Sequence, residues 1–203
     1  VCLDIQVALT KCSVPGRSLK LRSKPTSSGW VMTKVVPLDK AATYVTSRVA
    51  SSVVTLDNFV TVDNLLPNRA GLTIASGLPP AVGPMPAYMK DDVLVGNIRP
   101  YLKKIWFADR DGGCSNDVLV IRAKPGFNTR FLYYALLRDE FFTHMMNGKK
   151  GTKMPRGDKK QIMRFPIPEV PYQVQVQIAS VLSALDDKIA LNTRINAELE
   201  AMA

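Results

Sequence analysis

The C-terminal stretch from Pro166 to Ala203 constrains the fold more than any other part of the sequence. Three prolines hold its first residues extended, and after Pro171 neither proline nor glycine occurs again. A helix from Gln173 onward would be roughly 46 Å long at about 1.5 Å per residue, which exceeds the width of a domain of this size. We therefore expect a long helix that projects from the domain.

Apolar residues on this helix follow a heptad pattern. Spacings of four and three residues alternate, and asparagine stands at two central positions, 192 and 196. Buried asparagines set the register of many coiled coils. An ordinary amphipathic helix that folds back on the core of its own domain is the alternative. The pattern predicts a helix interface formed by Ile178, Leu182, Leu185, Ile189 and Leu199.

Length and composition indicate one folded domain with this helix as an appendage. The chain has 203 residues, of which 46% are hydrophobic, and this is enough to bury a full core. No apolar run has the length needed to cross a bilayer, and the first residues show no signal-peptide pattern. Three cysteines without CxxC spacing favour reduced thiols in a cytoplasmic protein, without disulfides or a zinc site.

Short strands and a few helices predict an α+β fold, with a small mixed sheet and packed helices before the long helix. Turns are expected at residues 67–71 and 111–113, and irregular loops at 78–86 and 147–164. One or two strands are expected within residues 51–67. The remaining elements are a short helix starting near Pro37, strands at 93–95, 105–107 and 118–121, a helix from Asn128 to Met146, and an edge strand at 165–168.

Positive charge is concentrated in one short segment. The chain carries a net charge of +10, and residues 147–164 contain seven lysines and arginines against one acid, Asp158. Glycines in this segment let the backbone approach a phosphate closely. It is not a Walker A loop, because the first glycine of that motif is missing. A solvated surface loop is the alternative. The segment predicts DNA contacts from Lys149, Lys150, Thr152, Lys153 and Arg156.

A second segment, GNIRPYLKK at residues 96–104, interleaves basic residues with an aromatic side chain. This combination suits a nucleic-acid surface. The alternative is that the basic residues merely line the outer face of a sheet. The segment adds Arg99, Tyr101 and Lys103 as candidate DNA contacts.

Motifs for catalysis are missing from the sequence. A methyltransferase that modifies DNA amino groups would require an Asn-Pro or Asp-Pro pair, and neither pair occurs. The Asp-x-Lys triplets at residues 158–160 and 186–188 lack the preceding Pro-Asp of a metal-dependent nuclease. We therefore expect a binding protein without catalysis of its own, and a stand-alone methyltransferase or nuclease is disfavoured.

Three stretches of the chain resemble the specificity subunits of type I restriction–modification systems. The resemblance covers roughly residues 30–203, and its most specific part is the proline-rich lead into the helix QIASVLSALDDKI. The chain departs from the family pattern at Val176, where an acid is common. The stretches are DNFVTVDNLLPNRAG at residues 57–71, DVLVGNIRPYLKKIWFADRDGGCSNDVLVIR at 92–122, and NGKKGTKMPRGDKKQIMRFPIPEVPYQVQVQIASVLSALDDKIALNTRIN at 147–196.

The resemblance implies a sequence-specific subunit that binds double-stranded DNA and directs methyltransferase and restriction subunits to a split target site. It implies a target recognition domain at 30–170 and a conserved coiled-coil or dimerisation helix at 171–203. Residues 1–29 lie outside the resemblance and are expected to be an N-terminal arm of unclear role. The family has two recognition domains per subunit, so this chain is similar to a half-subunit, for which a homodimer through the helix is expected.

The resemblance also places the cofactors elsewhere. S-adenosylmethionine, Mg²⁺ and ATP are expected on the partner subunits and none in this chain. The alternative from another class is a protein-interaction adaptor that works through its long helix and whose basic charge is incidental.

Overall fold

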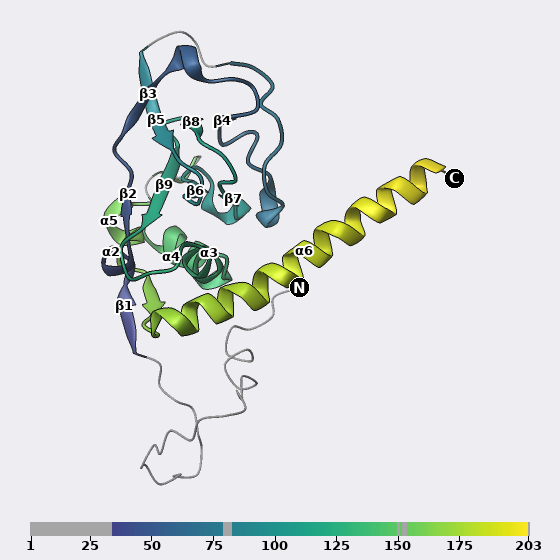
Figure 1. Ribbon diagram of the computed structural model, residues 1–203. Coiled ribbons are helices and arrows are strands. Elements are labelled where there is room, and N and C mark those ends of the chain that lie inside the picture. Colours follow the sequence, from purple (N-terminus) through teal and green to yellow (C-terminus); the bar gives the residue numbers. More distant parts are fainter. Residues whose placement is uncertain (1–33, 79–82, 150, 152–153, 203) are drawn as a thin grey trace, which may run out of the picture.

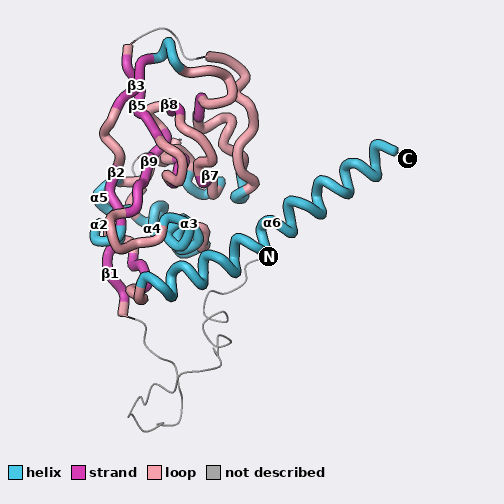
Figure 2. Tube along the Cα trace, viewed as in Figure 1, coloured by secondary structure: helices cyan, strands magenta, loops and turns pink. Residues whose placement is uncertain are grey.

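The computed structural model describes residues 34–78, 83–149, 151 and 154–202, and it confirms the α+β class (Figures 1 and 2). A first antiparallel sheet has the strand order β2-β9-β6-β7, and a second sheet has the order β3-β5-β8-β4, with β4 and β8 parallel. A two-stranded ribbon joins β1 to β10. The strands are β1 Val35–Pro37, β2 Ala42–Tyr44, β3 Arg48–Ala50, β4 Phe59–Val60, β5 Pro84–Tyr88, β6 Val93–Gly96, β7 Ile105–Phe107, β8 Gly112–Cys114, β9 Val118–Ala123 and β10 Pro166–Pro168.

Helices pack on one face of the first sheet, and α6 continues outward from them (Figure 1). The short helix after Pro37, the strands at β6, β7, β9 and β10, and the long C-terminal helix are confirmed. The helices are α2 Leu38–Ala41, α3 Thr129–Leu136, α4 Asp139–Asn147, α5 Lys159–Ile162 and α6 Tyr172–Met202, with 3-10 turns η1 Ser51–Val53, η2 Pro67–Arg69 and η3 Pro100–Leu102.

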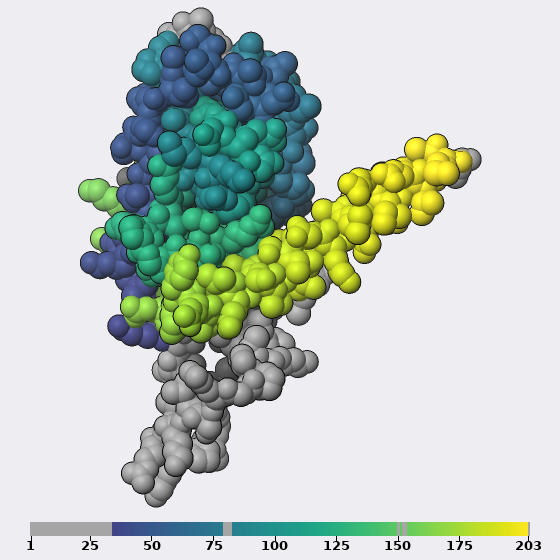
Figure 3. All heavy atoms as spheres, viewed as in Figure 1, coloured from purple at the N-terminus to yellow at the C-terminus, as the bar shows by residue number. Residues whose placement is uncertain are grey.

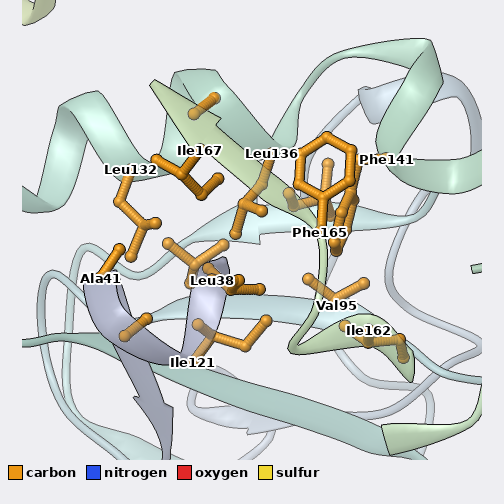
Figure 4. Close-up of a cluster of buried hydrophobic side chains, with 14 of the residues drawn as sticks. Leu38, Ala41, Val95, Ile121, Leu132, Leu136, Phe141, Ile162, Phe165 and Ile167 are labelled. Carbon is orange, nitrogen blue, oxygen red and sulfur yellow. The ribbon is translucent and has the colours of Figure 1, made fainter. Parts of the chain in front are cut away.

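The central strands β6 and β9 of the first sheet are buried on both faces along most of their length. Val93 and Val95 of β6 point into the core beneath the helices, whereas Leu94 between them belongs to a second core shared with the other sheet. In β9, Ile121 likewise belongs to the core beneath the helices, and Val120 belongs to the second core. Because neither face meets water, these strands are apolar without a polar alternation. Figure 4 shows the helical-side core, in which Val95 and Ile121 of the sheet lie together with Leu38, Leu132, Leu136, Phe141, Ile162, Phe165 and Ile167.

The helix predicted from Asn128 to Met146 is wrong as a single element. It is divided into α3 and α4, because Arg138 has an extended backbone (φ −67°, ψ 150°). Arg69 accounts for the break: its guanidinium donates to the Leu137 carbonyl oxygen and pairs with Asp139 at the start of α4. A distant arginine therefore stabilises the interruption, and helical periodicity alone could not reveal it.

Two loop predictions are wrong, and the prediction of one or two strands within residues 51–67 is met by one short strand. Gly112 and Gly113 were expected in a turn but form β8, where a side chain at Gly112 would collide with the Asn58 carbonyl. Prolines 84 and 86, expected in an irregular loop, lie in β5, where they pair with β3 on one side. Strand β8 pairs with β5 further along, at Ala87 and Tyr88, so the prolines occupy an edge position that proline tolerates. Only Phe59 and Val60 of the segment 51–67 form a strand, and residues 51–53 are the 3-10 turn η1.

Helix α6 has 31 residues and uses only its first turns to hold the domain. Ile178 and Ala179 are buried in the helical-side core, and Leu182 packs against that core. Every described residue from Ala184 onward is exposed. The helix thus projects as expected, and Figure 3 shows its C-terminal half leaving the body of the molecule.

The start of α6 is attached through one buried amide. Gln175 is 2% exposed, and its Oε1 accepts the N–H of Asn128, the N-cap residue of α3, at 2.8 Å. Its Nε2 donates to the Val170 carbonyl oxygen at 2.9 Å. Gln175 therefore joins α6, α3 and the lead from β10 in one hydrogen-bonded group.

Replacing Gln175 by methionine should destabilise the protein by about 1–3 kcal/mol, because the half-buried Asn128 N–H and Val170 carbonyl lose their partners while the volume is kept. Urea unfolding followed by circular dichroism measures the change. Gln177→Met on the exposed side of the same turn is the control and should alter the unfolding midpoint little. Equal effects of the two substitutions would contradict the role assigned to Gln175.

Candidate nucleic-acid interface

The two basic segments singled out in the sequence lie against each other. Ile98 and Arg156 form an antiparallel β-bridge, and the Arg99 N–H donates to the Pro155 carbonyl oxygen at 2.8 Å. The Gly157 N–H donates to the Asn97 carbonyl oxygen at 3.2 Å. These bonds join residues about 60 positions apart into one surface, which we call the basic junction: residues 97–101 and 154–157.

A buried side chain fills the inside of the basic junction. Asn97 is 8% exposed, and its Oδ1 has no hydrogen-bond partner among the described residues. A Cβ added to Gly157 would lie 3.0 Å from this oxygen and 2.9 Å from Cδ1 of Ile162. Close packing alone therefore requires glycine at position 157.

Arg156 is held at the surface of the basic junction. Its guanidinium Nη2 lies 3.1 Å from Oδ1 of Asp117, and both side chains remain about half exposed. Asp117 also accepts the Asn97 N–H through its carbonyl oxygen at 2.9 Å. Asp117 therefore positions Arg156 without removing it from solvent, and an exposed ion pair of this kind has little stabilising effect of its own.

Arg99 and Tyr101 project from a turn of unusual backbone. Arg99 and Lys103, the residues on either side of η3, both have positive φ of 52° and left-handed conformations. Non-glycine residues take this conformation at a cost that surrounding contacts must offset. The turn presents Tyr101 outward with 51% of its surface exposed.

Lys103 is engaged within the domain. Its ammonium lies 2.8 Å from Oδ1 of Asp139, which also pairs with Arg69. Hydrogen bonds from Lys103 and then Arg69 lower the pKa of the Asp139 carboxyl group. The cluster fastens η3 to the start of α4, so Lys103 shares a carboxylate that compensates its charge.

The remaining predicted contacts fall on the segment between α4 and α5. Lys149 is exposed just after α4. Lys150, Thr152 and Lys153 lie outside the described residues. The prediction of an irregular loop over residues 147–164 is wrong at its end, because Asp158 caps α5 by accepting the N–H groups of Lys160 and Gln161.

The predicted helix interface divides into two parts. Ile178 and Leu182 pack within the domain, as described above. Leu185, Ile189 and Leu199 are 41%, 59% and 58% exposed. The pattern therefore combines an internal contact at one end with an uncovered apolar seam at the other.

The sequence pattern does not reveal the residues that hold the basic junction together, above all Asn97 and Asp117. No local signal identifies them, since their partners are distant in sequence. Among the described residues, no group of three His, Cys, Asp or Glu side chains is arranged to hold a metal ion, and none of the helices combines the length and apolar character that a membrane span requires. Cys114 is buried, which raises the pKa of its thiol to about 12.

The chain is similar to one described protein family and to proteins of known function. The family described as "Type I restriction modification DNA specificity domain" matches residues 88–201. The type I restriction enzyme EcoDI specificity subunit of Escherichia coli is 33% identical over 86 residues, which cover 42% of this chain and 19% of that protein. The HindI specificity subunit of Haemophilus influenzae is 32% identical over 128 residues, covering 58% and 27%.

A solved structure shows the same fold. The HsdS subunit from Thermoanaerobacter tengcongensis superposes with a TM-score of 0.60 at 26% identity, covering 81% of this chain and 45% of that one. The chain therefore spans under a third of the length of the two curated relatives and under half of this structure.

Gly157→Ala tests the packing of the basic junction. The added methyl group would crowd Asn97 and Ile162, so we expect a loss of about 1–3 kcal/mol in unfolding free energy. Chemical denaturation measures it. Gly77→Ala, where a Cβ meets nothing within 4 Å, is the control and should stay near the wild-type value. A Gly157→Ala protein as stable as the control would show that the two segments are loosely held.

Proposed function

Since this chain belongs to the type I restriction–modification DNA specificity family, we propose that it recognises double-stranded DNA in a sequence-specific manner and directs methyltransferase and restriction subunits to a split target site. In this proposal it acts in the cytoplasm and carries no catalytic group of its own. S-adenosylmethionine, Mg²⁺ and ATP belong to the partner subunits.

The observation that carries this proposal is the basic junction. Two segments whose composition suits nucleic-acid binding are joined by the Ile98–Arg156 bridge. Arg99, Tyr101 and Arg156 therefore belong to backbone segments that lie side by side. A guanidinium can contact a guanine through two parallel hydrogen bonds, and lysines suit phosphates. We assign base contact to Arg156 and phosphate contact to Lys149, with Lys150, Thr152 and Lys153 extending the same segment.

This assignment gives the domain and the long helix separate roles. We propose residues 30–170 as the target recognition domain and 171–203 as the helix that joins it to other subunits or to a second recognition domain. The family assignment favours this role over the protein-interaction adaptor, in which the basic charge would be incidental.

Binding of duplex DNA at several salt concentrations tests the proposal. A protein that neutralises phosphates releases counterions, so its affinity should fall steeply as salt rises. A gel-retardation assay with the full chain, alone and with a type I methyltransferase subunit, measures the slope. Affinity that is absent or independent of salt in both preparations would favour the adaptor.

Arg156→Ala should weaken binding to the target by about 1–3 kcal/mol and relax selectivity at one base pair. Lys149→Ala should weaken binding to all sequences alike and lower the salt slope by about one. The matched control is Arg110→Ala, since Arg110 is also a partly exposed arginine paired with a neighbouring carboxylate, that of Asp109 at 2.7 Å. Identical losses for Arg110→Ala and Arg156→Ala would remove the basic junction from the DNA surface.

The exposed seam of α6 supports a proposal about assembly. Leu185, Ile189 and Leu199 would be buried against the same helix of a second copy, running antiparallel, which gives a symmetric dimer that recognises two inverted half-sites. The helix of roughly 46 Å corresponds to a little more than one DNA turn of about 34–36 Å, which sets the spacer between the half-sites.

Leu185→Glu should dissociate this dimer and abolish binding to the split site, because the seam would bury a charge. The domain should keep its fold, since the Leu185 side chain is 41% exposed and lies outside the helical-side core. Light scattering at tens of micromolar measures the mass, and Ala190→Glu, exposed on the same helix but off the seam, is the control. A monomeric wild-type chain would instead assign the seam to a second recognition domain or to the methyltransferase subunit.

A further inference from the structure

A groove opens where the chain passes from the first sheet to the second. The Val45 N–H still donates to the Val120 carbonyl oxygen of β9 at 3.0 Å, whereas the Ser47 carbonyl oxygen accepts the N–H of Ala87 in β5 at 2.9 Å. The strands β2 and β3 therefore have different neighbours, and a cavity of about 280 Å³ lies beside residues 44–48, which connect them. Divergence of the two sheets thus creates a cavity that the sequence pattern does not indicate.

The groove has an apolar floor and a polar, positively charged rim. Val118 to Val120 of β9 form the floor together with Tyr44. Arg48, Asn116 and Lys159 lie on the rim, and all three side chains are exposed. The hydroxyl groups of Thr46 and Ser47 complete the lining.

Arg48 is held in place on this rim. Its Nε and Nη2 atoms donate to the Pro84 carbonyl oxygen at 3.1 and 2.7 Å. Two of the five N–H donors of a guanidinium are used in this way, and the group is fixed before any ligand arrives. A pre-positioned guanidinium loses less freedom when it binds a phosphate.

Lys159 lines the same groove as Arg48, and its backbone is also held in place. It is the first residue of α5, and its carbonyl oxygen accepts the Tyr44 hydroxyl at 3.0 Å. Burial, and then the neighbouring Asp158 carboxylate, raise the pKa of Tyr44, so this hydroxyl stays protonated and keeps donating. The acids near the groove are themselves engaged, because Asp158 caps α5 and Asp117 pairs with Arg156.

The groove adjoins the basic junction. Lys159 follows Arg156 by three residues, and Asn116 directly precedes Asp117, the partner of Arg156. We propose that the groove holds the sugar–phosphate backbone of one DNA strand, with Arg48 and Lys159 each binding a phosphate beside the base pair that Arg156 contacts. This inference rests on the proposed function and adds two DNA contacts to it. Arg48 lies outside both basic segments, and Lys159 lies within the second segment but is not among the contacts that the sequence predicts.

The chemistry of the rim fits a phosphodiester. Guanidinium, ammonium, hydroxyl and amide groups are the side-chain donors that most often contact phosphate oxygens. Such contacts fix the register of the protein on the duplex and carry no sequence information directly. The groove is therefore a positioning site, distinct in its effect from the base contact assigned to Arg156.

Salt-dependent binding of a fluorescein-labelled duplex of mixed sequence, followed by anisotropy with the full chain, tests the proposal. Arg48→Gln combined with Lys159→Ala should lower the slope of log affinity against log salt by about two. Arg48→Lys should keep the wild-type slope. Lys124→Ala is the control, since Lys124 is an exposed lysine beyond the opposite end of β9, and it should also keep that slope. If Arg48→Gln fails to fold by circular dichroism, Lys159→Ala alone should lower the slope by about one.

The outcomes separate the groove from the function on which it rests. A double variant with the wild-type slope, alongside weakened Arg156→Ala and Lys149→Ala variants, would overturn the groove and leave the proposed function standing. A change of preference at one base pair without a change of slope would overturn the phosphate assignment. Absence of duplex binding by the wild-type chain would overturn both proposals.

Discussion

Burial of the β6–β9 pair on both faces is the constraint from which the rest of this structure follows. The helices α2 to α5 and the start of α6 cover one face, and the second sheet covers the other. One charged residue sits in this arrangement at almost no exposure: Asp92, whose two carboxylate oxygens each accept a 2.7 Å bond from Arg122 of β9. With both faces occupied, the loops at the strand ends are left as the surface available for recognition.

The basic junction illustrates how such a surface is built. The composition of each segment identifies Arg99 and Arg156 as candidate DNA contacts. Their proximity comes from the backbone hydrogen bonds between residues 97–99 and 155–157. Inside the junction, Asn97 Oδ1 has no hydrogen-bond partner among the described residues, which costs free energy. At the same place Gly157 packs closely against both Asn97 and Ile162. A rigid platform of this kind positions exposed side chains better than two independent loops, because fewer conformations are lost on binding.

Helix α6 serves two purposes along its length. Its first turns complete the core of the domain, with Gln175 buried and hydrogen-bonded to two other elements. Tyr134 of α3 adds a 2.7 Å bond to Asp186, at the point where the helix leaves the body. Beyond that bond the apolar seam has no cover within the described residues. The direction of the free half is therefore set by the anchored half, which matters for any partner that binds it.

The sequence alone determined the long helix, the apolar strands of the first sheet, the class of fold and the two basic segments, because each depends on local periodicity or composition. It did not determine the break between α3 and α4, the pairing of Pro84–Tyr88 as a strand, or the ion pair between Lys103 and Asp139. Each of these depends on a partner tens of residues away. The groove beside Arg48 and Lys159 is of the same kind, since it exists only where two sheets diverge. Local chemistry selects which elements form, whereas long-range contacts decide which side chains share a surface.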